Sequence, residues 1–186
     1  NIGPAIDLAH GVALSPDGRL LAQVSNIINP IMLANTNSQG MRIAPASEAK
    51  EFISGRQIYW PQDIPYAEQE GISVSFTPDN RGLVCLTVSG TLILWDPQLN
   101  SLKWKIATIG SPAQVLVSFD GNLIATANKE KGAQIFDAHT GALLRSIAAK
   151  KSITSLAFDA KSQQLATADG ASVHLYDVKT AKLMRT

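Results

Sequence analysis

The residue types that most often carry catalysis or bind metals are few in this sequence and lie far apart. Its histidines are His10, His139 and His174, and its single cysteine is Cys85. There is no HExxH motif, no cysteine pair and no Cys–His spacing of the kind that holds zinc. The sequence therefore predicts no metal site.

Nucleophile and phosphate-binding motifs are absent as well. Neither GxSxG, GxxxxGK[ST] nor GxGxxG occurs in the chain. The sequence SPDG at 15–18 contains Ser and Asp, but turn chemistry explains it, because Pro fixes φ and Gly tolerates positive φ. Carboxylates from distant segments could still converge in the fold. We expect no catalytic or cofactor-binding residue and interpret the chain as a non-enzyme.

One segment has the chemistry of a docking arm. It contains Tyr59, Trp60, Asp63 and Tyr66 around the sequence PQDIP. Rigid aromatic rings bury a large area at small entropic cost, and prolines hold the backbone extended, so the segment suits a protein partner. The alternative is that Tyr59 and Trp60 fold back over an exposed sheet edge.

Four lysines form a second candidate binding group: Lys129, Lys131, Lys150 and Lys151. Such a group could contact a phosphate backbone or an acidic peptide. However, Glu130 interrupts it, and a formal net charge of +1 is far below the basic excess expected of a nucleic-acid binder. We therefore expect other proteins as partners, and not nucleic acid.

Composition indicates an ordered globular chain, with 45% apolar and 17% charged residues in 186. A lone cysteine inside an apolar run excludes an intrachain disulfide and favours a small buried thiol. No stretch approaches the roughly 20 apolar residues that a membrane helix needs, and the start shows no signal-peptide pattern. We expect a cytoplasmic protein, and a chain that begins partway through a larger protein or after processing.

The elements that must position these residues recur along the chain. An apolar run, a tight turn and a second apolar run appear as VALSPDGRLLA, VSFTPDNRGLV, VLVSFDGNLIA and LAFDAKSQQLA, which begin at Val12, Val74, Val115 and Leu156. Their turns are spaced by 62, 41 and 41 residues. A period near forty built from short β-type runs predicts stacked sheets in a propeller, each repeat being one blade.

Each repeat is expected to hold four antiparallel strands. The second shows them most clearly, at 72–76, 83–88, 92–95 and 102–106. The third and fourth repeats follow the same pattern. In the first repeat, we expect strands at 12–14, 20–24, 31–33 and 41–43.

An aromatic residue followed by Asp closes the third strand of three repeats: Trp95-Asp96, Phe136-Asp137 and Tyr176-Asp177. Together with the SPDG-type turns, these pairs resemble the signature dipeptide of the WD-repeat family. The first repeat departs from the pattern, with Leu33 in the aromatic place. The resemblance implies an all-β fold, a β-propeller of four-stranded antiparallel blades forming part of a larger ring. It also implies a non-catalytic scaffold for protein–protein interaction.

The expected boundaries follow from the repeats. Residues 1–10 are a lead-in or the end of a preceding blade, 11–44 a degenerate first blade, 45–70 an inserted loop, and 71–107, 108–148 and 149–186 the remaining blades. WD-repeat rings usually have about seven blades. We therefore expect further blades from a longer chain, from another chain or from another copy, with a compact ring of four as the alternative.

Antiparallel geometry predicts which loops lie together. Connections between second and third strands leave a sheet at the same end as connections between blades. The 45–70 insertion and the four lysines should therefore share one face, which we take as the partner-binding site. The alternative function is a sensory or regulatory segment of a larger enzyme or ligand-binding propeller.

Overall fold

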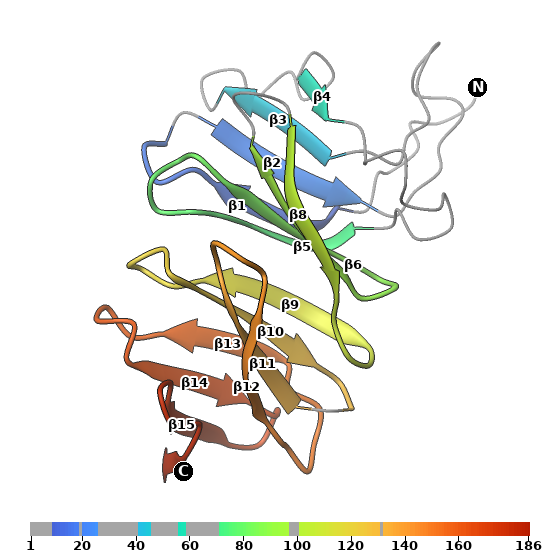
Figure 1. Cartoon of the computed structure of the whole chain (residues 1–186). Helices are drawn as coiled ribbons and strands as arrows, with labels where there is room; N and C mark the ends of the chain where they lie inside the picture. The colour runs from blue at the N-terminus through green and yellow to red at the C-terminus, as the bar shows by residue number, and fades with distance from the viewer. Residues whose placement is uncertain are drawn as a thin grey trace, which may run out of the picture.

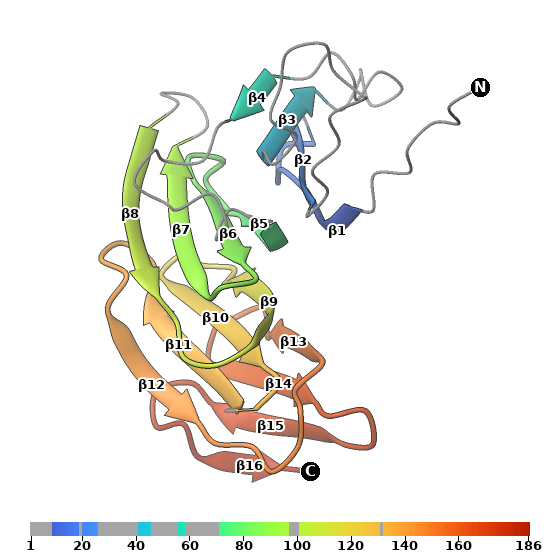
Figure 2. The same cartoon turned by 90° about the vertical axis from the view of Figure 1, so that its right-hand side faces the viewer.

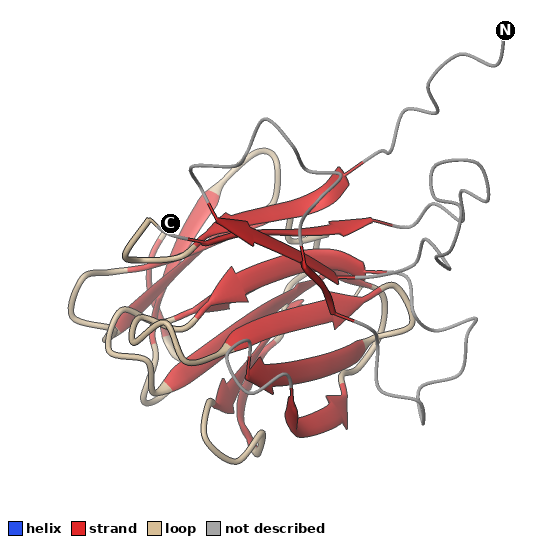
Figure 3. Cartoon of the chain, turned by 90° about the horizontal axis from the view of Figure 1, so that it is seen from above, coloured by secondary structure: helices blue, strands red, loops and turns tan. Residues whose placement is uncertain are grey.

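The structure is a computed structural model that describes residues 9–18, 20–25, 41–45, 56–58, 71–96, 101–130 and 132–186. These residues form four antiparallel sheets of four strands each, with no helix among them (Figure 3). The all-β, bladed architecture expected from the repeats is confirmed. No helix in the described part is long and apolar enough to cross a membrane.

Strands follow one another in chain order within every sheet. The first sheet holds β1 (Ala9–Leu14), β2 (Leu20–Ser25), β3 (Met41–Pro45) and β4 (Arg56–Ile58). The second holds β5 (Gly71–Phe76), β6 (Leu83–Thr87), β7 (Thr91–Asp96) and β8 (Ser101–Ala107). The third holds β9 (Pro112–Val117), β10 (Leu123–Asn128), β11 (Gly132–Asp137) and β12 (Leu143–Ile147). The fourth holds β13 (Ser155–Phe158), β14 (Gln164–Ala168), β15 (Val173–Asp177) and β16 (Leu183–Arg185).

The sheets stack face to face, as the blades of a propeller do (Figures 1 and 2). First strands lie against first strands, β5 packing on both β1 and β9. The middle strands β6 and β7 are apolar on both faces because a sheet covers each side, and nearly every residue in them is buried. The outer strands β8 and β12 are mostly exposed. Three apolar clusters thus fill the spaces between successive sheets.

A repeated hydrogen bond joins β5 to β9 and β9 to β13. The Ser73 hydroxyl accepts from the backbone N–H of Val115 at 3.0 Å, and the Gln114 side-chain oxygen accepts from the N–H of Leu156 at 2.8 Å. Both bonds span 42 residues, so they occupy equivalent places in the repeat. Ser155 is the next equivalent residue, and it is exposed. This side-chain position therefore satisfies an N–H of the next blade in the second and third repeats, whereas the equivalent residue of the first repeat, Gly11, has no side chain.

The first turn of each repeat also contacts its neighbour. Its last residue adopts a left-handed conformation, with φ of 70° at Gly18, 61° at Asn80, 75° at Gly121 and 57° at Ser162. Where that residue has a polar side chain, it accepts a hydrogen bond from the preceding turn. The Asp120 N–H donates to the Ser162 hydroxyl at 3.1 Å. The turns therefore align blades as well as reversing the chain.

In the aromatic–Asp pairs, the ring and the carboxylate have different structural roles. Phe136 is buried between the second and third sheets. The Asp137 carboxylate next to it accepts from the Thr140 N–H at 2.8 Å and from the Thr140 hydroxyl at 2.9 Å. Asp177 makes the same pair of bonds with Thr180. The ring therefore packs the blade interface, while the carboxylate closes the turn into the fourth strand.

The first sheet corrects the strand positions expected for its repeat. The third strand is β3 at 41–45, and the fourth is β4 at 56–58. The expected strand at 31–33 lies outside the described residues. Segment 41–45 cannot be the outer strand, because it pairs with β2 on one side and β4 on the other. The fourth strand thus falls within 45–70, the range expected to be an inserted loop.

The two end sheets each have a face that no described sheet covers. On the first sheet, Val12 and Leu14 are both 58% exposed, whereas the equivalent Val74 and Phe76 are buried. On the fourth sheet, Val173 is 61% exposed. These residues have the apolar character of a blade interface.

Candidate protein-binding surfaces

The structure brings three of the four candidate lysines to one end of the sheets. Lys129 lies in the hairpin between β10 and β11, while Lys150 and Lys151 lie in the connection from β12 to β13. The two segments touch, because the Ser152 hydroxyl donates to the Lys129 carbonyl at 2.6 Å. A further bond from the Lys129 N–H to the Ser111 carbonyl, at 2.9 Å, ties in the preceding connection. We call the surface of Lys129, Lys150 and Lys151 the connector face.

Acidic groups lie beside these lysines. The Ser111 hydroxyl donates to the Glu130 carboxylate at 3.3 Å. The pKa of Asp169 is lowered, chiefly by the N–H groups of Ala171 and Ser172 and with a smaller contribution from the charge of Lys151. The connector face therefore carries charges of both signs.

The other candidate residues are not placed by the structure. Tyr59, Trp60, Asp63, Tyr66 and Lys131 lie outside the described residues. The aromatic segment follows β4 directly in the sequence, so it leaves the outer strand of the first sheet. Whether it contacts the connector face stays a prediction.

The opposite end of the sheets carries two grooves, each between neighbouring blades. The groove between the second and third sheets has a volume of about 470 Å³. Its lining includes five charged or ionisable side chains, those of Asp79, Arg81, Lys103, Asp120 and His139. Lys103 is engaged within the chain, since its ammonium group donates to the Arg81 carbonyl at 2.9 Å and lies 3.4 Å from the Asp96 carboxylate. We call this the polar groove.

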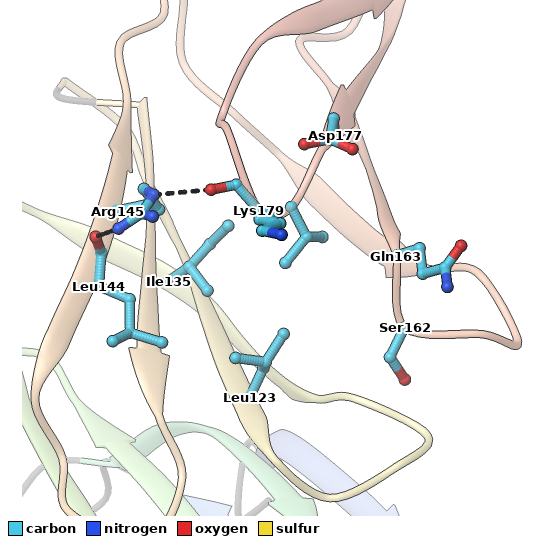
Figure 4. Close-up of a pocket in the computed structure, with 9 residues that line it drawn as sticks. Leu123, Ile135, Leu144, Arg145, Ser162, Gln163, Asp177 and Lys179 are labelled. Carbon is cyan, nitrogen blue, oxygen red and sulfur yellow. Dashed lines mark hydrogen bonds between the residues drawn. The ribbon is translucent and has the colours of Figure 1, made fainter.

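The groove between the third and fourth sheets has a different lining. Its volume is about 450 Å³, and its apolar residues are Leu123, Ile135, Leu144 and Val178. Figure 4 shows Leu123, Ile135 and Leu144 pointing into the same space, with Arg145 above them. We call this the apolar groove.

Arg145 is held at the border of the apolar groove. Its Nε–H donates to the Lys179 carbonyl at 2.9 Å, across the gap between the third and fourth sheets, and its Nη1 donates to the Leu144 carbonyl at 2.6 Å (Figure 4). In the preceding repeat the equivalent residue is Trp104, whose indole N–H donates to the Ala138 carbonyl at 3.1 Å. Sequence reasoning missed this groove. The signal was an Arg and a Leu where the second repeat has Trp104 and Lys103.

The histidines and the cysteine have structural surroundings. His174 lies 3.4 Å from the Asp169 carboxylate and 3.1 Å from the Thr186 hydroxyl. Cys85 is fully buried, and burial raises the pKa of its thiol. Over the described ranges, no three His, Cys, Asp or Glu side chains gather as metal ligands would.

Known proteins with similar sequences agree with the repeats described above. Residues 133–177 match the family described as WD domain, G-beta repeat. A curated relative, the Ribosome biogenesis protein WDR12 homolog of Drosophila mojavensis, is 32% identical over 138 residues. That alignment covers 73% of this chain and 32% of the fly protein, so the chain spans about a third of its relative.

A solved structure shares the arrangement of sheets. Hydrazine synthase from Kuenenia stuttgartiensis superposes with a TM-score of 0.75 over 100% of this chain and 51% of that one. At 14% identity, this likeness shows the fold alone. The fold is a β-propeller.

The repeated sheets, the matched repeat and the fly relative together identify a WD-repeat family protein. The resemblance carried by the aromatic–Asp pairs is therefore confirmed. A role in protein interaction is the function that this family membership supports.

Proposed function

We propose that this chain is a non-catalytic scaffold that binds other proteins through its connector face. The observation that carries the proposal is the meeting of two basic segments, the Lys129 hairpin and the Lys150–Lys151 connection, at one end of stacked blades. Lys129, Lys150 and Lys151 are all exposed, and the backbone beneath them is fixed by hydrogen bonds. A backbone held by hydrogen bonds that presents exposed cationic side chains suits an acidic surface of a folded partner.

The mixed charge of this face favours a protein over a nucleic acid. A polyphosphate chain would meet Glu130 and Asp169 as well as the lysines. The name of the fly relative refers to ribosome biogenesis. We infer a comparable setting for this chain, in which it contributes contacts within a multicomponent assembly. The 45–70 segment, with Tyr59, Trp60, Asp63 and Tyr66, would add aromatic contacts beside the lysines.

Charge reversal tests the proposal. A Lys129→Glu, Lys150→Glu, Lys151→Glu variant and the unaltered chain would be used as baits in an extract of the source cells, with bound proteins quantified by mass spectrometry. The matched control reverses three exposed cations at the opposite end, in an Arg81→Glu, Lys161→Glu, Lys182→Glu variant. We expect specific partners to be lost only from the first variant. Retention of every partner by that variant would contradict the proposal.

A further inference from the structure

We propose that the apolar groove is a second binding site, which takes a short peptide segment with a large aromatic or aliphatic side chain flanked by acidic residues. The site is separate from the connector face, because it lies among the turns at the opposite end of the sheets. Its existence does not depend on the function proposed for the lysines.

The floor of the groove is already built. Ile135 is fully buried and Val178 is 7% exposed, and both belong to the apolar cluster between the third and fourth sheets. Leu144 stands at the rim with 39% of its surface exposed. A volume of about 450 Å³ falls within the range of small-ligand and peptide-anchor pockets. An aromatic side chain seated there would bury apolar surface without a rearrangement of the backbone.

The polar groove differs from the apolar groove at two equivalent lining positions. Lys103 occupies the place of Leu144 and Gly82 that of Leu123, in the same turn and strand positions of the preceding repeat. Lys103 meets groups of its own chain there, the Arg81 carbonyl and the Asp96 carboxylate. A leucine cannot make these bonds, and Leu144 places a partly exposed apolar side chain at this position. A concave site lined mainly by apolar side chains, with a few polar groups at its border, is the usual form of a ligand pocket.

Charge at the rim selects the flanking residues of that ligand. Arg145 and Lys179 border the groove, and both are exposed. The guanidinium has five N–H donors in a planar fork, and the bonds to Lys179 and Leu144 engage its Nε and Nη1. Asp177 also lines the groove, but one of its oxygens accepts both the N–H and the hydroxyl of Thr180. The rim therefore favours carboxylates beside the apolar anchor.

Synthetic peptides test this site directly on the intact chain. Three fluorescein-labelled probes would be titrated by fluorescence anisotropy, with cores Glu-Glu-Trp-Leu-Glu, Lys-Lys-Trp-Leu-Lys and Glu-Glu-Gly-Ser-Glu. The test variants are Leu144→Lys, which copies the residue of the polar groove, and Arg145→Glu. The matched control is Arg81→Glu, the same charge reversal at the rim of the polar groove. All three positions are exposed, and thermal unfolding would verify that each variant folds.

We expect the acidic tryptophan peptide to bind the unaltered chain and the Arg81→Glu control equally. Leu144→Lys and Arg145→Glu should each weaken its binding by about tenfold or more. The basic peptide and the glycine–serine peptide should bind at least about tenfold more weakly than the first. Equal binding to all variants, equal binding of the three peptides, or no binding at about 1 mM peptide would overturn the proposal. None of these outcomes bears on the connector face, whose lysines are unchanged throughout.

Discussion

The repeated hydrogen bond between first strands makes the sharpest test of how the blades cohere. Gln114 projects from β9 and accepts from the Leu156 N–H of the next blade at 2.8 Å. Leu156 is 5% exposed, and its N–H lies on the innermost strand of its sheet. The Gln114→Ala change removes the acceptor and leaves this buried donor without its protein partner.

The expected cost follows from that geometry. A buried N–H deprived of its acceptor costs about 1–3 kcal/mol. Gln114 itself is only half-buried, so water can replace part of the lost bond, and we expect about 1–2 kcal/mol. With a urea m value of about 2 kcal/mol/M, the unfolding midpoint should fall by about 0.5–1 M. Equilibrium urea unfolding followed by tryptophan fluorescence measures this shift.

Two further substitutions in the same chain serve as controls for Gln114→Ala. Ser155 holds the equivalent position in the fourth repeat but is exposed, so Ser155→Ala should move the midpoint by less than about 0.2 M. Gln114→Glu keeps an acceptor oxygen and should retain most of the stability at neutral pH. Equal midpoints for Gln114→Ala and Ser155→Ala would refute the view that this bond couples the blades.

Three further predictions concern the turn at Ala181, the loss of stability at acid pH through Asp137, and the reactivity of the Cys85 thiol. Ala181 adopts a φ of 56°, which costs a residue with a Cβ roughly 1 kcal/mol, so Ala181→Gly should raise the free energy of unfolding by up to that amount in urea titrations. Asp137 has a lowered pKa, first because of the Thr140 N–H and then its hydroxyl. The folded pKa of Asp137 lies below the unfolded value of about 3.9. The stabilising contribution of this carboxylate is therefore complete above about pH 3.9 and is lost as the pH falls through the folded pKa. In the Asp137→Asn variant, the urea midpoint of unfolding should fall less steeply between about pH 5 and pH 2 than in the unaltered chain. Cys85 should resist a disulfide-exchange reagent in the native chain and react rapidly in urea, because burial raises the pKa of its thiol; fast native labelling would contradict its placement.

The later repeats could be predicted from sequence because local and long-range signals agree there. Apolar runs, tight turns and aromatic–Asp pairs recur at a nearly fixed spacing from Val74 onward, and each strand pairs with its neighbour in the chain. The same antiparallel connectivity predicted that Lys129 would lie beside Lys150 and Lys151. These inferences needed only the order of the strands.

The first repeat and the apolar groove could not be predicted in the same way. In the first repeat, 31–33 is an apolar segment and 41–43 has apolar residues on either side of Arg42, and the choice of third strand depends on pairing with β2. No aromatic–Asp pair marks the strand end. The groove gathers side chains from two repeats, and it has Leu123 and Leu144 where the groove of the preceding repeat has Gly82 and Lys103. This difference between the two repeats can be recognised only after the structure shows that the two grooves occupy equivalent places between successive sheets.

Site-specific photocrosslinking tests the proposed scaffold role most directly. A benzophenone amino acid would replace Lys150 on the connector face and, in a control chain, Lys161 in the turn at the opposite end. After irradiation in an extract of the source cells, we expect a discrete protein adduct from position 150 and none of the same mass from position 161. The same adducts from both positions, or none from position 150, would contradict a partner-binding connector face.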